Sequence, residues 1–152
     1  MKMCSHWIAA TLFALSMMMV APHTHAEERY GKQKAVYDLH LDGGEGDKAF
    51  LHAMRNVKNH LNAVGQDNIE IKVVLAGNGL GMLKSANTNL ELQGAISDLK
   101  RQKVVFLVCN NTLVGRNIDP DSLFEVFKED IVPSGNAEIA HLQSKGFAYI
   151  RP

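Results

Sequence analysis

The sequence VVFLVCNNT, residues 104–112, is the clearest indication of the fold class. Its first five residues are apolar without interruption, which is typical of a central strand that is buried on both faces of a sheet. The run ends at Cys109, and the polar residues 110–112 that follow favour a turn. We therefore expect a strand over residues 104–108 that delivers Cys109 to its carboxyl end.

Strands and helices alternate on both sides of this run. The residue patterns predict further strands over residues 35–41, 69–76, 131–132 and 147–150, and helices over residues 47–64, 92–102, 119–127 and 136–144. Alternation of this kind requires right-handed crossovers and gives a mostly parallel sheet with helices on both faces. The predicted fold class is α/β, a three-layer α/β/α domain with a mostly parallel sheet of about five strands.

The first 26 residues have the composition of a signal peptide. Lys2 gives a positive start, and the apolar run at residues 7–21 is shorter than the roughly 20 residues that span a bilayer. Small residues at positions 24 and 26 predict cleavage after Ala26. We expect a signal peptide at 1–26, a polar leader at 27–33 and a single domain at 34–152, exported to the periplasm without stable membrane insertion. An uncleaved N-terminal anchor is the alternative.

The charges and the cysteines limit the function. The net charge is zero and the basic residues are scattered, so nothing indicates nucleic acid as a partner. Cys4 leaves with the signal peptide, which makes Cys109 the single cysteine of the mature chain in an oxidising compartment. A reactive thiol and an inert, buried cysteine are both consistent with its position.

Ligands of open parallel sheets bind beyond the carboxyl ends of the strands. This rule places the turns at residues 42–45, 77–79, 109–112 and 134–135 at one edge. His40, near the end of the first strand, is a candidate base that faces Cys109, whereas Asp38 is assigned a structural role. Turn formation alone would also explain the glycines and asparagines. The candidate ligand-binding residues around Cys109 are His40, Gly77, Asn78, Gly79, Asn110, Asn111 and Thr112.

Several classes of site have no support in the sequence. The four mature histidines have no metal-ligand spacing, and neither a Ser-His-Asp order nor a P-loop is present. The glycines at residues 77–81 lack the spacing of a dinucleotide-binding motif. We therefore expect no metal and no cofactor.

Three segments resemble the DsrE/DsrF-like family: VYD at residues 36–38, VVLAGNGL at 73–80 and VFLVCNNTL at 105–113. The sequence IVPSGNAEIAHLQSKGFAYIRP, residues 131–152, is similar to the closing helix and strand of that family. The resemblance covers nearly all of the chain from Lys34 onward. It implies a small α/β/α domain, homo-oligomers and, in some members, a cysteine that carries sulfur as a persulfide in cytoplasmic relays. Cys109 matches the position of that cysteine.

Two functions from different classes follow. The first is a periplasmic sulfur-handling protein that binds or carries sulfane sulfur on Cys109, as a sulfur carrier or sulfurtransferase without turnover of its own. Its partners would be a small sulfur compound or a sulfur-donor protein. The alternative is a non-catalytic module of the same fold that binds a small ligand or serves oligomeric assembly. The signal peptide departs from the family pattern, because the partners of a cytoplasmic relay are absent outside the inner membrane.

Overall fold

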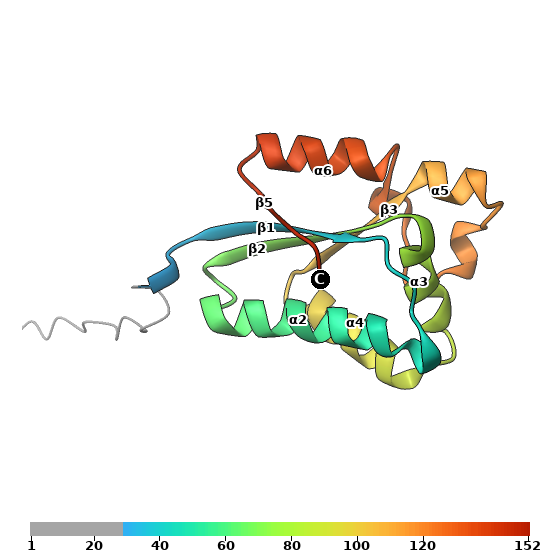
Figure 1. Cartoon of the computed structure of the whole chain (residues 1–152), viewed down its shortest axis with the longest axis horizontal. Helices are drawn as coiled ribbons and strands as arrows, with labels where there is room; N and C mark the ends of the chain where they lie inside the picture. Colours follow the sequence, from blue (N-terminus) through green and yellow to red (C-terminus); the bar gives the residue numbers. More distant parts are fainter. Residues whose placement is uncertain (1–28) are drawn as a thin grey trace, which may run out of the picture.

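A five-stranded, fully parallel sheet forms the middle layer of the computed structural model, which describes residues 29–152 (Figure 1). The predicted signal peptide and its cleavage site lie outside the described residues. The strand order is β4-β3-β2-β1-β5, and all four pairings are parallel. The predicted α/β class with a parallel sheet is therefore confirmed. The strands are β1 (Gln33–Leu39), β2 (Ile69–Leu75), β3 (Val105–Cys109), β4 (Ile131–Val132) and β5 (Ala148–Ile150).

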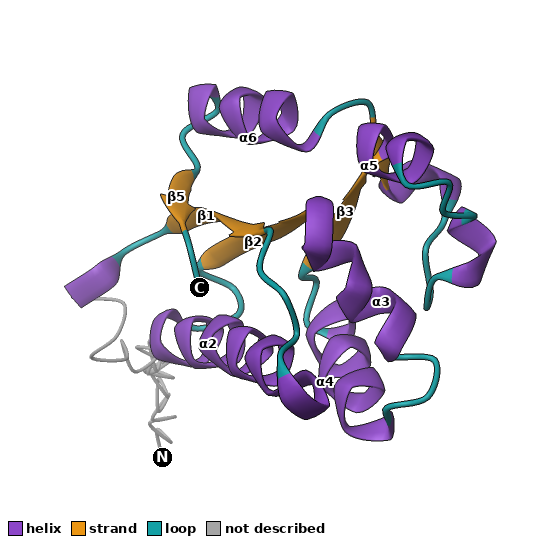
Figure 2. Ribbon diagram, turned by 45° about the vertical axis from the view of Figure 1, so that its right-hand side comes forward, coloured by secondary structure: helices purple, strands orange, loops and turns teal. Residues whose placement is uncertain are grey.

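Helices cover both faces of this sheet, as Figure 2 shows. Helix α2 (Lys48–Val64) and helix α4 (Leu90–Arg101) lie on one face, and helix α6 (Gly135–Ser144) lies on the other. Two shorter helices, α3 (Gly81–Ser85) and α5 (Asn110–Gly115), lie at the end of the sheet where the strands finish. The three expected layers are present.

Helix α2 shows why the sequence pattern predicts its element well. Its apolar residues recur every three or four positions, so they form one continuous stripe along the helix. Gly65 ends the helix with a φ of 92°, a conformation that glycine adopts without strain. The side chains of the stripe are all buried: Phe50, Ala53, Met54, Val57, Leu61 and Val64.

The sheet separates two apolar cores, because successive side chains of a strand point to opposite faces. Tyr37 belongs to the larger core under α2 and α4, whereas its neighbour Val36 belongs to the smaller core under α6. Leu107 also faces α6, so Cys109, two residues further along β3, points to the same side. The remaining buried members of the smaller core are Val74, Ile139, Leu142 and Phe147.

The segment between α5 and β4 differs from its prediction. The expected helix over residues 119–127 is wrong, since only a short 3-10 helix at Pro120–Ser122 forms there. Asp119 does cap its start, because its carboxylate accepts a hydrogen bond from the N–H of Asp121 at 3.0 Å. Further on, the N–H of Phe124 donates to the carbonyl oxygen of Leu83 at 3.0 Å. This long-range contact holds the segment in a non-helical conformation.

No helix within residues 29–152 has the length and apolar character needed to cross a bilayer.

Candidate functional site

Cys109 is the last residue of β3, and α5 begins at the next residue. Its side chain is buried, with 5% of the residue exposed, but it lines a pocket of about 230 Å³. The pocket lies beyond the carboxyl ends of the strands, as expected for a parallel sheet. Its other lining residues are His40, Ala76, Gly77, Asn111, Thr112, Ser134, Gly135 and Asn136.

The start of helix α6 packs directly against this cysteine. Ser134 caps the helix, because its hydroxyl accepts a hydrogen bond from the N–H of Ala137 at 3.5 Å. A Cβ atom at Gly135 would lie 3.4 Å from the Cβ of Cys109 and 3.2 Å from that of Ala76. Glycine at this position therefore lets the first backbone N–H of α6 reach the sulfur.

The surroundings of the sulfur favour its charged form. Burial by itself raises the pKa of the Cys109 thiol, since a thiolate loses hydration. Hydrogen bonds from the Thr112 hydroxyl and from the N–H groups of Gly135, Thr112 and Asn111 outweigh burial, and the pKa lies below its ordinary value of 9.0. A lowered pKa increases the fraction of thiolate, which is the nucleophilic form of cysteine.

Thr112 is itself oriented by the backbone. Its hydroxyl oxygen accepts a hydrogen bond from the N–H of Gly77 at 3.0 Å. A hydroxyl group has one hydrogen to donate and can accept at the same time. Because Gly77 fills an acceptor position, the hydroxyl hydrogen remains available to the sulfur of Cys109. The turn after β2 thus stabilises the thiolate at the end of β3.

His40, which also lines the pocket, is held in place by a carboxylate. Its Nδ1 donates a hydrogen bond to Asp38, and the second carboxylate oxygen of Asp38 accepts from the Tyr149 hydroxyl at 2.7 Å. This hydrogen bond to Asp38 raises the pKa of Tyr149. In the neutral ring the proton then resides on Nδ1, which leaves Nε2 as an acceptor. No hydrogen bond within residues 29–152 occupies that Nε2.

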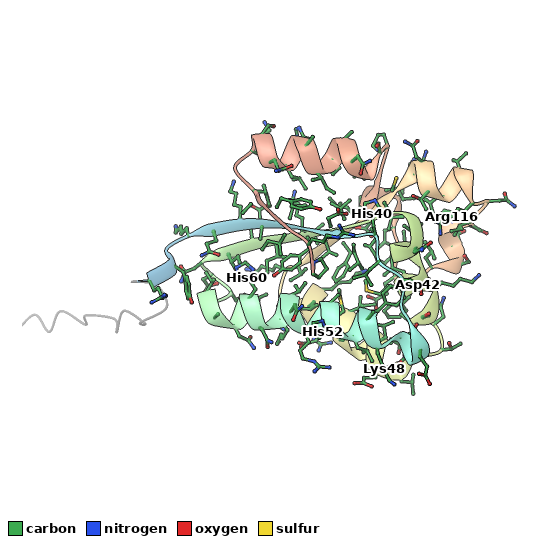
Figure 3. All side chains as sticks on the ribbon, in the orientation of Figure 1. His40, Asp42, Lys48, His52, His60 and Arg116 are labelled. Atoms are coloured by element: carbon green, nitrogen blue, oxygen red, sulfur yellow. The ribbon has the colours of Figure 1, made fainter. Side chains whose placement is uncertain are left out.

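Figure 3 shows His40 at the end of the strands, with Arg116 next to it. Gly77 lies close to both side chains. A Cβ atom on this glycine would lie 3.6 Å from Cδ2 of His40 and 3.7 Å from Nη2 of Arg116. Gly77 has a φ of 56°, so a substitution there would be strained as well as crowded.

The structure brings only some of the predicted site residues together around Cys109. His40, Gly77, Asn111 and Thr112 line the pocket with Cys109. Asn78 lines a neighbouring pocket instead. Gly79 is buried beneath the end of β1, where a Cβ atom would lie only 1.8 Å from the carbonyl oxygen of Leu39. Asn110 is exposed and lines a separate pocket beside α5.

Sequence reasoning missed several residues of the site. The sequence predicts Ser134 and Gly135 at the correct edge of the sheet but not among the ligand-binding residues. A serine before a helix start is a capping signal, so it indicates that a helix begins beside the pocket. Asp38 was expected to be structural and holds His40. No local signal indicated Tyr149, because its contact requires β5 to pair with β1.

The fold and the strand-end cysteine define a small α/β/α domain with a thiol pocket at the carboxyl edge of its sheet. The model of the DsrE/DsrF-like family matches residues 39–152, and the chain belongs to this family. The chain is also similar to the solved structure of a protein of unknown function from Methanobacterium thermoautotrophicum. That structure is 30% identical in sequence with a TM-score of 0.64, and the match covers 80% of this chain and 100% of the other. No curated protein matches the chain.

Proposed function

We propose that this protein carries sulfane sulfur on Cys109 as a persulfide. The observation that carries the proposal is the pocket around the thiol, in which the Thr112 hydroxyl and three backbone N–H groups stabilise the thiolate. A structural cysteine has no need of such donors, because a buried neutral thiol is stable in an apolar environment. The arrangement is that of a nucleophile.

The transfer of sulfur proceeds as an exchange between thiolate and persulfide. The Cys109 thiolate attacks the outer sulfur of a donor R–S–SH, and a new S–S bond forms. The S–S bond of the donor breaks, and its electron pair leaves with the thiolate R–S⁻. Cys109 then holds the group S–SH, and no external oxidant or reductant is consumed.

His40 supplies a proton acceptor in the same pocket. Because Asp38 holds Nδ1, Nε2 of this pocket-lining residue is left to take a proton that the thiol releases. The ring then returns this proton to the leaving thiolate. Asp38 acts through His40, as a positioning residue.

Intact mass spectrometry of the purified protein tests the proposal. Cys109 is the only cysteine of the chain without its first 26 residues. Treatment with glutathione persulfide should add the mass of one sulfur atom, and a reductant should remove it. The Cys109→Ser variant should gain nothing while keeping its circular dichroism spectrum, since serine nearly preserves the volume. A wild-type mass that does not change would leave the non-catalytic binding module as the better function.

We propose further that the protein works in the periplasm after cleavage behind Ala26, as a homo-oligomer. The apolar side chains of Leu90, Val114 and Phe127 are 76%, 72% and 58% exposed, and association would bury such surface. N-terminal sequencing of the periplasmic fraction should give Glu27 as the first residue. Light scattering should give a multiple of the monomer mass, and a monomer at every concentration would contradict the assembly.

A further inference from the structure

A second and larger pocket lies directly beside the pocket of Cys109. Its volume is about 330 Å³, against about 230 Å³ for the pocket of Cys109. Gly77 belongs to the lining of both pockets. His40 lines the first pocket and Arg116 the second, and both approach Gly77 to within 4 Å of where a Cβ would be. A glycine without a side chain is therefore the boundary between the two spaces.

The charged side chains of the second pocket differ in what they already bind. Its acids have donors from the protein: Asp42 accepts from the N–H of Gly44 at 3.0 Å, and Asp47 accepts from Asn89 at 3.0 Å. Its two basic side chains, Arg116 and Lys84, form no ion pair or hydrogen bond with any residue in the range 29–152. Both side chains are exposed and have no partner in the described part of the chain, so they are available to bind an anion.

We propose that the second pocket binds the carboxylate of a small organic persulfide that loads Cys109, with Arg116 and Lys84 as the donors. This inference rests on the proposed sulfur-carrying function. The guanidinium of Arg116 matches a carboxylate with two parallel hydrogen bonds. The bound molecule extends past Gly77, so that its persulfide lies in the pocket of Cys109.

The size and charge of the pocket favour an organic anion over an inorganic one. A space of about 330 Å³ is within the range of small-molecule sites and exceeds what a sulfur oxyanion fills. Each acid also has a second carboxylate oxygen, which an ammonium group can meet. Thiols of the amino-acid or short-peptide type carry both groups, a carboxylate and an ammonium. Glutathione persulfide is the probe that represents this class.

Loading rates with three donors test the inference. Intact mass spectrometry would follow the mass gain of wild type and Arg116→Gln with glutathione persulfide, thiosulfate and the persulfide of 2-mercaptoethanol, which has no carboxylate. We expect Arg116→Gln to load about tenfold more slowly from glutathione persulfide, because a charge-assisted pair is lost. Loading from the persulfide of 2-mercaptoethanol should change by less than about twofold, because this donor has no carboxylate for Arg116 to bind.

The matched control is Arg101→Gln. Arg101 ends α4, which precedes β3, so it lies at the opposite edge of the sheet and pairs with Asp98 at 3.1 Å. This variant should load like wild type from all three donors. Equal slowing of Arg116→Gln with glutathione persulfide and with the persulfide that lacks a carboxylate would overturn the inference. Slowing with thiosulfate alone would also overturn it, because the occupant would then be an inorganic oxyanion.

A binding measurement separates this inference from the proposed function. S-methylglutathione has the same charges but no sulfur to transfer. Calorimetry should show about tenfold weaker binding of this compound to Arg116→Gln than to wild type or Arg101→Gln. If Cys109 accepts sulfur from no donor but Arg116→Gln still binds S-methylglutathione more weakly than wild type, the carboxylate site is supported and the sulfur-transfer function is contradicted. Equal binding to wild type and Arg116→Gln would remove the site and leave sulfur transfer to the loading experiment.

Discussion

Strand β1 carries two polar networks on its opposite faces, and each contains one histidine. On the α2 side, the hydroxyl of Tyr37 and Nδ1 of His60 lie 3.0 Å apart, and Nε2 of His60 lies 2.9 Å from the amide oxygen of Gln33. An amide oxygen only accepts, so Nε2 of His60 carries the proton and Nδ1 accepts from Tyr37. Burial lowers the pKa of His60 and raises the pKa of Tyr37 to about 12. This network is neutral and complete.

The network on the α6 side is open. Asp38 holds Nδ1 of His40 and accepts from Tyr149. His40 lines the pocket of Cys109, and its Nε2 has no hydrogen-bond partner among the described residues. The two histidines are therefore distinguished by their second nitrogen rather than by burial or by the presence of a partner. A nitrogen that is already bound stabilises the fold, and a nitrogen left free is available for chemistry.

The largest expected effect is a difference between His40 and His60 variants in the rate at which Cys109 is loaded with sulfur. His40→Gln should slow the loading of Cys109 from glutathione persulfide at least about tenfold, because a proton acceptor is lost from the pocket. His60→Gln should load at the rate of wild type. Intact mass spectrometry at several times gives both rates. Similar loading rates for the two variants would contradict the assignment of a proton-accepting role to His40 alone.

The same pair of variants should behave in the opposite way during urea unfolding. His60→Gln disturbs a hydrogen bond to the buried hydroxyl of Tyr37 and should lower the free energy of unfolding by about 1–2 kcal/mol. The side chain of His40 is 36% exposed and its Nε2 has no partner to lose, so His40→Gln should stay within about 0.5 kcal/mol of wild type. A large loss of stability in His40→Gln would mean that its slow loading reports a damaged fold.

Two tyrosines permit a smaller, matched comparison. Tyr37→Phe leaves Nδ1 of His60 without its donor next to the buried face of β1 and should cost about 1 kcal/mol of unfolding free energy. Tyr149 is 46% exposed, so water replaces its hydroxyl in Tyr149→Phe and the cost should stay below about 0.5 kcal/mol. Denaturation midpoints at equal slope give both values. Equal losses of unfolding free energy would contradict the distinction between the His60 network, in which both ring nitrogens are bound, and the His40 network, in which Nε2 is free.

The smallest expected effect is a dependence of stability on pH. The pKa of His60 in the folded protein lies below its ordinary value of 6.5, so the unfolded chain binds a proton at a higher pH than the folded protein does. Stability from this group is complete above pH 6.5 and is lost as the pH falls through the folded pKa. Unfolding curves between about pH 5 and pH 7 should therefore show a shallower slope in His60→Gln than in wild type.

The sequence predicts the elements that have strong local patterns. The apolar run before Cys109 and the stripe of α2 predicted β3 and α2 closely, because periodicity and burial follow directly from the side chains. The prediction of a helix over residues 119–127 is wrong. The cap at Asp119 and the proline after it favour a helix start, but the hydrogen bond between Phe124 and Leu83 does not allow the helix to continue. Tertiary contacts override local preference there.

The site was partly predictable for the same reason. The rule for parallel sheets placed Cys109, Gly77 and His40 at one edge, and the structure puts all three around one pocket. The rule does not give the order of the strands. Without that order, the link from Asp38 to Tyr149, 111 residues apart, has no signal in the sequence.

That link also sets the time at which the site forms. Asp38 lies in β1 and Tyr149 lies in β5, the first and last strands of the described residues. Contacts among β1, α2 and β2 can form early in folding, because these elements follow one another in the sequence. His40 gains the complete support of Asp38 only after residues 148–150 have paired with β1. The histidine of the thiol pocket is thus fully oriented late in folding, after contacts that are local in the sequence.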